Sequence, residues 1–198
     1  MRRALGLLFS IAGVAILLVV GVAYGRGALA RDRARATWSA LEARDAVLTA
    51  NARATAAPVR GTVAVGAPMG RLIIPAIDLD EVVVEGVGDA QLAAGPGHLP
   101  GSAFPGDVGN AVISAHRDRH FHGLDHLALG DTVITETMAG RTTWVVVGRR
   151  IVKRGEPALY PTDTPTLTLT TCWPVRYIGP APDRLLITAK PIPTGRHT

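Results

Sequence analysis

The feature that most constrains this chain is an uncharged run of 20 residues near its start, Leu5 to Tyr24. As an α-helix, a run of this length rises about 30 Å, which matches the hydrocarbon thickness of a bilayer. We therefore interpret it as a membrane anchor. A cleaved signal peptide is the alternative, because Arg2 and Arg3 precede the run and Ala28-Leu29-Ala30 provides an A-x-A site. The run is, however, longer than the usual apolar region of a signal peptide, about 7 to 15 residues.

The positive charge of the chain is concentrated around this run. Residues 1–60 hold nine arginines and three acidic residues, a net charge of +6, whereas the whole chain carries +5, so the remainder carries −1. Because the excess lies beside an apolar segment, attraction to anionic lipid headgroups explains it better than recognition of nucleic-acid phosphates does. We expect a membrane-embedded protein that has no nucleic-acid partner.

Composition divides the chain into four segments. Residues 1–27 are expected to form an N-terminal tip and the membrane anchor (or an uncleaved signal), whose orientation the charges alone leave open, and residues 28–69 a stalk and linker rich in Ala and Arg. Residues 70–192 form a globular domain, and residues 193–198 form a tail. Good helix formers predict a partly helical stalk, and Pro and Gly residues predict the linker. A helix packed on the domain or lying on the bilayer surface is the alternative interpretation of the stalk.

After residue 70 the chain changes to short runs of Val, Ile, Thr and Leu separated by Gly, Pro and Asp, which predicts an all-β domain. The expected strands lie near residues 71–75, 79–85, 110–114, 132–137, 141–147, 149–154, 166–172 and 184–190. Residues 88–94 predict one short helix, which Pro96 ends. About eight strands with little helix to cover a sheet favour a closed β-barrel, because closure pairs the edges of a small sheet.

Cys172 is the single cysteine of the sequence, which excludes an internal disulfide and a metal cluster of several thiolates. It ends the β-rich run 166–171 and precedes Trp173-Pro174, so the thiol is expected at the end of a strand. Arg184 begins the next expected strand. If the two strands pair antiparallel, Cys172 and Arg184 face each other, and the guanidinium can meet negative charge that develops near the sulfur.

His116 closely follows another expected strand, 110–114, in a similar arrangement of strand and polar residue. A histidine beside a cysteine can activate the thiol as a thiolate and return the proton to a departing amine. A zinc site is the alternative use of this region, although its flexible spacing is weaker than a defined ligand motif. The residues that could contribute to such a site are His116, Asp118, His120, His122, Asp125 and His126. We favour the interpretation of His120, His122 and His126 as loop residues.

These residues resemble those of the sortase family. The run Thr168-Leu169-Thr170-Thr171-Cys172 matches the sortase TLxTC signature, and Arg184 lies at the spacing at which sortases carry their essential arginine. Cys172-Trp173-Pro174 is similar to class D or Gram-negative-type sortases. Upstream segments are similar to sortase barrels in the same order, namely 71–75, 85–87, 95–101 and 109–118. One departure is Ala115, where sortases commonly have Gly before the histidine.

The resemblance implies a sortase-like barrel that acts as a membrane-anchored cysteine transpeptidase. Cys172 would attack an LPxTG-like sorting signal of a surface protein, and an amine on the cell envelope would resolve the thioacyl enzyme. His116 would handle protons, Arg184 would clamp the oxyanion and the substrate, and Thr171 and Thr170 would contact the substrate. No metal or organic cofactor is needed. The implied location is the plasma membrane, crossed once, with the catalytic domain outside the cytoplasm.

Three other functions are weighed against this one. A hydrolytic cysteine peptidase would use the same acyl enzyme with water as the acceptor. A non-catalytic membrane-tethered binding module could keep the fold without turnover. An L,D-transpeptidase is disfavoured because 56 positions separate His116 from Cys172, whereas that family has its cysteine close after a histidine. The sequence leaves open the sorting motif, the substrate protein and the amine acceptor.

Overall fold

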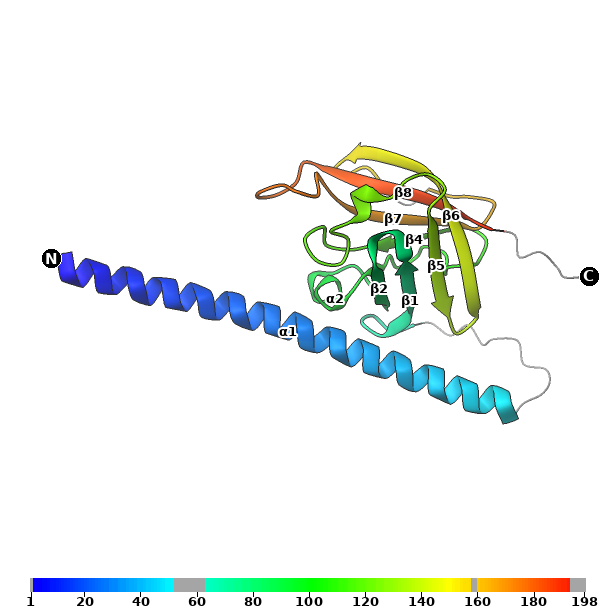
Figure 1. Ribbon diagram of the computed structural model, residues 1–198, viewed down its shortest axis with the longest axis horizontal. Coiled ribbons are helices and arrows are strands. Elements are labelled where there is room, and N and C mark those ends of the chain that lie inside the picture. Colours follow the sequence, from blue (N-terminus) through cyan, green and yellow to red (C-terminus); the bar gives the residue numbers. More distant parts are fainter. Residues whose placement is uncertain (1, 52–62, 158–159, 193–198) are drawn as a thin grey trace, which may run out of the picture.

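The structure, a computed structural model, describes residues 2–51, 63–157 and 160–192. A single long helix, α1 (Arg2–Asn51), runs along one side of a β-barrel (Figure 1). The helix includes both the apolar run and the Ala/Arg-rich segment that follows it, because no proline interrupts the good helix formers of either part. At 1.5 Å per residue its 50 residues extend about 75 Å.

The barrel is closed and mixed, which confirms the predicted fold class. Its neighbouring strands follow the order β1-β2-β3-β4-β7-β8-β6-β5, with β5 pairing back onto β1. The pairs β2–β3 and β4–β7 are parallel, and the others are antiparallel. The strands are β1 (Pro68–Ile74), β2 (Leu79–Glu85), β3 (Gly97–His98), β4 (Asn110–Ser114), β5 (Thr132–Thr137), β6 (Gly140–Lys153), β7 (Thr166–Trp173) and β8 (Asp183–Pro191).

Two strands differ from those predicted. The two strands expected at 141–147 and 149–154 are one long strand, β6, because Gly148 lies at a bulge in the pairing with β8 and does not end the strand. The two-residue strand β3 was not predicted, because a segment so short and so rich in Gly and Pro carries no strand pattern. The short helices are α2 (Asp89–Ala94), η1 (Pro75–Ile77) and η2 (Leu124–His126).

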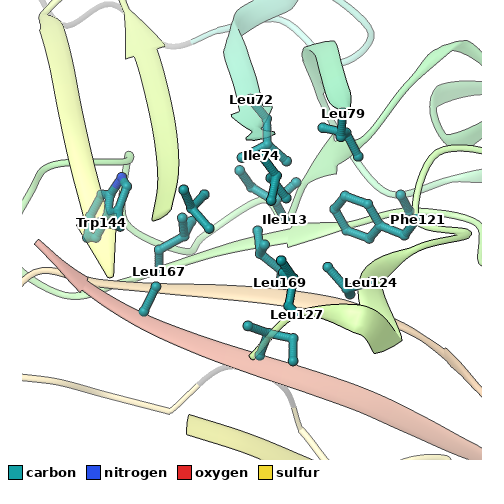
Figure 2. Packing of buried hydrophobic residues seen from close by; sticks show 14 of the residues in the cluster. Leu72, Ile74, Leu79, Ile113, Phe121, Leu124, Leu127, Trp144, Leu167 and Leu169 are labelled. Atoms are coloured by element: carbon teal, nitrogen blue, oxygen red, sulfur yellow. The ribbon is translucent and has the colours of Figure 1, made fainter. Parts of the chain in front are cut away.

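The interior of the barrel is filled by aliphatic side chains that alternate along the strands, together with Trp144 and Phe121 (Figure 2). Leu167 and Leu169 of β7 point into this core and are fully buried. Phe121, which is not on a strand, is fully buried in the same cluster. Phe121 therefore anchors the loop after β4 to the core of the barrel.

The middle of α1 packs against the outside of the barrel, which is one of the arrangements that the sequence left open. Ala34, Trp38 and Leu41 contact Val82 and Val84 of β2 in a second apolar cluster. Residues 6–26, by contrast, are exposed, and this half of the helix projects beyond the barrel (Figure 1). Among the described residues, α1 is the one helix that is long and apolar enough to cross a membrane.

Candidate functional site

The ends of β7 and β8 form the first part of the candidate site. The antiparallel register of these strands places Cys172 directly opposite Arg184, as the sequence led us to expect. Directly opposed residues in such a pair project from the same face of the sheet. Leu167 and Leu169 point into the barrel, so Cys172, at an odd offset from them, lies on the outer face. Both Cys172 and Arg184 are partly exposed there.

The end of β4 brings His116 to the same rim. β4 pairs parallel with β7, and Ser114 is the partner of Thr170. The pairing continues past the strand, because the Ala115 backbone N–H donates to the Thr170 carbonyl at 3.1 Å. His116 directly follows Ala115 on this side, and Cys172 lies two residues after Thr170 on the neighbouring strand, so both residues lie at the same end of the β4–β7 pair. His116 is half-buried at this position.

Thr171 holds the two strand ends together from the inside. Its hydroxyl donates a hydrogen bond to the Ala115 carbonyl at 2.8 Å, and its side chain is buried. The Thr171 hydroxyl thus contacts the backbone of the residue that precedes His116. Thr170 lies on the same face as Cys172, and its buried hydroxyl has no hydrogen-bond partner among the described residues.

Thr171→Val is expected to lower the free energy of unfolding by about 1–3 kcal/mol, because it leaves the buried Ala115 carbonyl without its partner at nearly unchanged side-chain volume. Urea unfolding of the full chain measures the change. Thr188→Val is the matched control, since the Thr188 hydroxyl makes no comparable bond in the part of the chain that the structure describes. An equal loss of unfolding free energy in the two variants would show that the Thr171–Ala115 hydrogen bond does not contribute to stability beyond the general effect of replacing a threonine.

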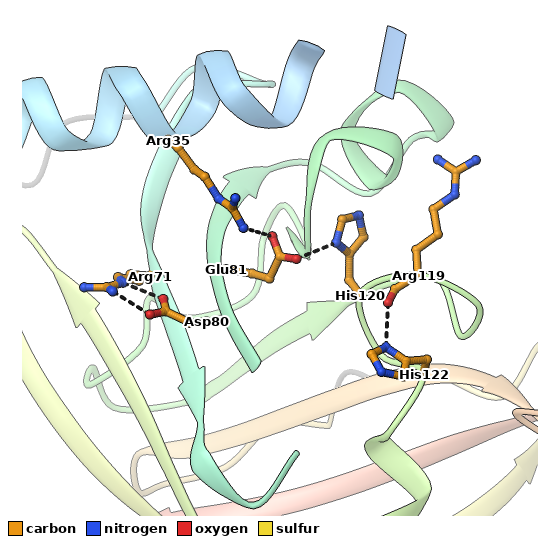
Figure 3. Close-up of polar contacts among 7 residues, drawn as sticks. All are labelled: Arg35, Arg71, Asp80, Glu81, Arg119, His120 and His122. Carbon is orange, nitrogen blue, oxygen red and sulfur yellow. Dashed lines mark hydrogen bonds and ion pairs between the residues drawn. The ribbon is translucent and has the colours of Figure 1, made fainter. Parts of the chain in front are cut away.

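The loop that follows His116 is fastened to both the barrel and α1 (Figure 3). The Phe121 N–H donates to the His116 carbonyl at 3.0 Å, which closes a tight turn. The Nδ1 of the buried His120 lies 3.2 Å from a Glu81 carboxylate oxygen, and the other oxygen of Glu81 is 3.5 Å from the Arg35 guanidinium of α1. Burial alone raises the pKa of Glu81, but its bond to His120 and the nearby positive charges lower it overall. Helix α1 is thus linked to the loop that carries His116.

Arg117 connects this loop to the one between β7 and β8. Its guanidinium donates to the carbonyls of Pro174, Tyr177 and Gly179 at 3.2, 3.0 and 2.8 Å. Its Cζ also lies 5.7 Å from the centre of the Tyr177 ring. The sequence analysis did not predict that Arg117 bridges the two loops. Its position next to His116 is the one signal in the sequence that could have drawn attention to it. Arg117 therefore couples the position of His116 to that of the segment after Cys172.

Burial is the main cause of a lowered pKa at His116, because it disfavours the charged imidazolium. Asp118 acts in the opposite direction and raises this pKa, whereas Arg119 and His120 lower it further. At neutral pH the His116 imidazole is therefore uncharged and able to accept a proton. Since its pKa lies below the ordinary 6.5, its contribution to stability is present above pH 6.5 and is lost as the pH falls.

Two substitutions beside His116 are expected to move its pKa in opposite directions. Asp118→Asn removes a charge that raises the pKa of His116 and so lowers it, whereas Arg119→Gln removes a charge that lowers it and so raises it. NMR titration of the His116 ring protons measures both shifts. Arg154→Gln, an exposed change elsewhere, serves as the control and should leave the titration unchanged. Shifts of the same sign for Asp118→Asn and Arg119→Gln would contradict this account of the site.

The histidines considered for zinc do not converge. His120 bonds to Glu81, the Nδ1 of His122 lies 2.8 Å from the Arg119 carbonyl, and His126 lies 3.9 Å from an Asp125 oxygen. Among residues 2–51, 63–157 and 160–192, no group of three or more His, Cys, Asp or Glu is placed to hold a metal ion.

A closed, mixed eight-stranded barrel that carries Cys, His and Arg at neighbouring strand ends defines a narrow class of proteins. Comparison with known proteins gives the family: residues 72–192 match the model of the sortase domain. The chain therefore belongs to the sortase family, whose members are cysteine transpeptidases.

Individual relatives agree with this family. The chain is 34% identical over 127 residues to sortase D of Bacillus subtilis, an alignment that covers 63% of this chain and 64% of that protein. A Clostridium perfringens sortase D5 transpeptidase structure is 25% identical with a TM-score of 0.60 and covers 66% of this chain and 82% of its own. The structure of the lid mutant of Streptococcus agalactiae sortase C1 is 28% identical with a TM-score of 0.61. The match covers 86% of this chain and 93% of that chain.

Proposed function

We propose that this protein is a membrane-anchored cysteine transpeptidase that cleaves an LPxTG-like sorting signal through a thioacyl enzyme and transfers the acyl group to an amine on the cell envelope. The observation that carries the proposal is the register that pairs Cys172 with Arg184, while the β4–β7 pairing brings His116 to the same rim. Membership of the sortase family supports the same reaction type.

Each of the three residues has a role in this reaction. His116, uncharged at neutral pH because its pKa is lowered, accepts the proton of the Cys172 thiol as the sulfur attacks the peptide carbonyl carbon. The Arg184 guanidinium, opposite Cys172, stabilises the negative charge that develops on the carbonyl oxygen. The imidazolium then gives its proton to the departing amine, and the thioester remains on the sulfur.

The second half of the reaction reverses these proton transfers. An incoming amine attacks the thioester carbonyl, His116 removes the proton of the amine, and the Cys172 sulfur leaves. We propose that Thr170 and Thr171, which directly precede Cys172, contribute to substrate binding. Thr170 shares the face of Cys172, and its buried hydroxyl has no partner among the described residues. The hydroxyl of Thr171 also bonds to the Ala115 carbonyl and so helps to fix the segment that carries His116.

The proposed arrangement places the protein in the plasma membrane, with one crossing by the apolar part of α1 and the barrel outside the cytoplasm. The exposed apolar surface of residues 6–24 supports this crossing. The proposed segments are an anchor within residues 1–27, a stalk and linker over 28–69, the barrel over 70–192 and a tail over 193–198. Of these, the stalk includes the part of α1 that packs on β2.

Incubation of the full chain in nanodiscs with LPxTG-like peptides and candidate amines, followed by mass spectrometry, tests the proposal. A peptide adduct on the wild-type protein that is absent from Cys172→Ala, and that an amine converts to a new amide, is the expected result. Products of hydrolysis alone, whatever amine is supplied, would replace transpeptidation with peptidase activity. Amide formation by Cys172→Ala would refute the assigned nucleophile.

A further inference from the structure

A fully exposed apolar side chain lies at the tip of the loop between β7 and β8. Ile178 is 100% exposed, and Tyr177 beside it is 48% exposed. The backbone at this tip is held in place, because Arg117 bonds to the carbonyls of Tyr177 and Gly179, on either side of Ile178. Transfer of such a side chain from water to an apolar medium is favourable. The structure therefore presents Ile178 outward on a supported loop.

The tip lies on the side of the barrel that faces the projecting half of α1. Arg119, two residues after Arg117, has its Cζ 4.4 Å from the centre of the Tyr24 ring. Tyr24 ends the apolar run, and tyrosine favours the boundary between lipid hydrocarbon and headgroups. Figure 1 shows the β7–β8 loop extending beyond the barrel in the direction of the N-terminal half of α1. The loop and the end of the membrane-crossing segment thus lie at one side of the molecule.

We propose that Tyr177 and Ile178 enter the boundary layer of the same bilayer that α1 crosses, with the exposed Arg176 among the lipid headgroups. This inference rests on the membrane anchor of the proposed function. An aromatic, an aliphatic and a basic side chain in sequence are the types that such a boundary accommodates. The contact gives the barrel a second attachment besides α1, and it holds the rim with Cys172 next to the membrane surface.

The single cysteine makes the test direct. Cys172→Ala gives a chain without cysteine, into which Ile178→Cys, Met138→Cys or Val14→Cys introduces one site for an NBD fluorophore. Met138 is also exposed, but it lies beside Glu42 and Ala46 of α1, about 30 Å further along the helix than Tyr24. Val14 is in the middle of the apolar run. Each full chain is reconstituted in phosphatidylcholine–phosphatidylglycerol vesicles with or without doxyl-labelled lipid.

The label at Ile178 is expected to emit at shorter wavelength than the label at Met138 and to lose most of its fluorescence to doxyl lipid, as the label at Val14 does. Equal, water-like signals at Ile178 and Met138, with quenching at Val14, would overturn the inference and leave the anchor intact. Equal quenching at Ile178 and Met138 would also overturn it, because the whole barrel would then lie on the lipid. Absence of quenching at Val14 would remove the anchor and this inference together. None of these readouts depends on transpeptidation.

Discussion

His116→Ala is expected to lower kcat/KM for peptide transfer by about 10²- to 10⁴-fold, the usual contribution of a positioned general acid and base. The substitution removes the imidazole that follows β4, at the same end of the β4–β7 pair as Cys172. Both halves of the reaction need it, because a thiol proton must leave and an amine must be protonated. Steady-state transfer from an LPxTG-like peptide to an amine, monitored over a range of pH, measures the loss.

His126→Ala is the matched control for this experiment. His126 is largely exposed, and its side chain lies 3.9 Å from Asp125. Its loss should leave kcat/KM and its pH dependence close to those of the wild type. If His116→Ala retained full activity with the same acidic limb, His116 would not be the group that exchanges protons with Cys172.

Arg184→Gln is expected to lower kcat by about 10²- to 10³-fold, the range found when one donor to a developing oxyanion is removed. Arg184 is the direct cross-strand partner of Cys172, and in the proposed reaction its charge stabilises the carbonyl oxygen that becomes negative. Arg184→Lys should recover only part of the loss, because an ammonium keeps the charge but not the planar set of donors. Single-turnover formation of the acyl enzyme measures the chemical step.

Arg141→Gln provides the comparison for charge alone. Arg141 is an exposed residue of β6 whose ion pair is with Glu136, and its removal should not change acyl-enzyme formation. Full activity of Arg184→Lys would indicate that a positive charge suffices and that the fork of guanidinium donors is not used. Unchanged acylation in Arg184→Gln would exclude the oxyanion role.

The barrel could be predicted from the sequence because its strands are short β-rich runs bounded by Gly, Pro and Asp. The predictions were wrong where a signal was ambiguous or too short. In the sequence, Gly148 indicates the end of a strand. In the structure it lies at a bulge within β6, and the residues on both sides of the bulge pair with β8. β3 has two residues, Gly97 and His98, and is a strand only because it closes the sheet between β2 and β4.

Residues at strand ends in the candidate site could also be predicted, since Cys172 and Arg184 belong to strands joined by one loop. Contacts between distant segments could not. Glu81 and His120 are 39 positions apart, and Arg117 and Gly179 are 62 positions apart, so no local pattern signals either pairing. The buried 2.7 Å contact between His98 and Glu85 is another pairing that no local sequence pattern signals. Such side chains become partners only when closure of the barrel brings their strands or loops together.

The presence of a single thiol also determines how the protein can recover from oxidation. Cys172 is partly exposed, and these 198 residues offer no second sulfhydryl that could resolve a sulfenic acid by forming an internal disulfide. Recovery from oxidation must therefore come from an external reductant or thiol. A covalent cross-link through sulfur can form only with another molecule, so a disulfide-linked dimer of this chain would have both of its Cys172 residues blocked.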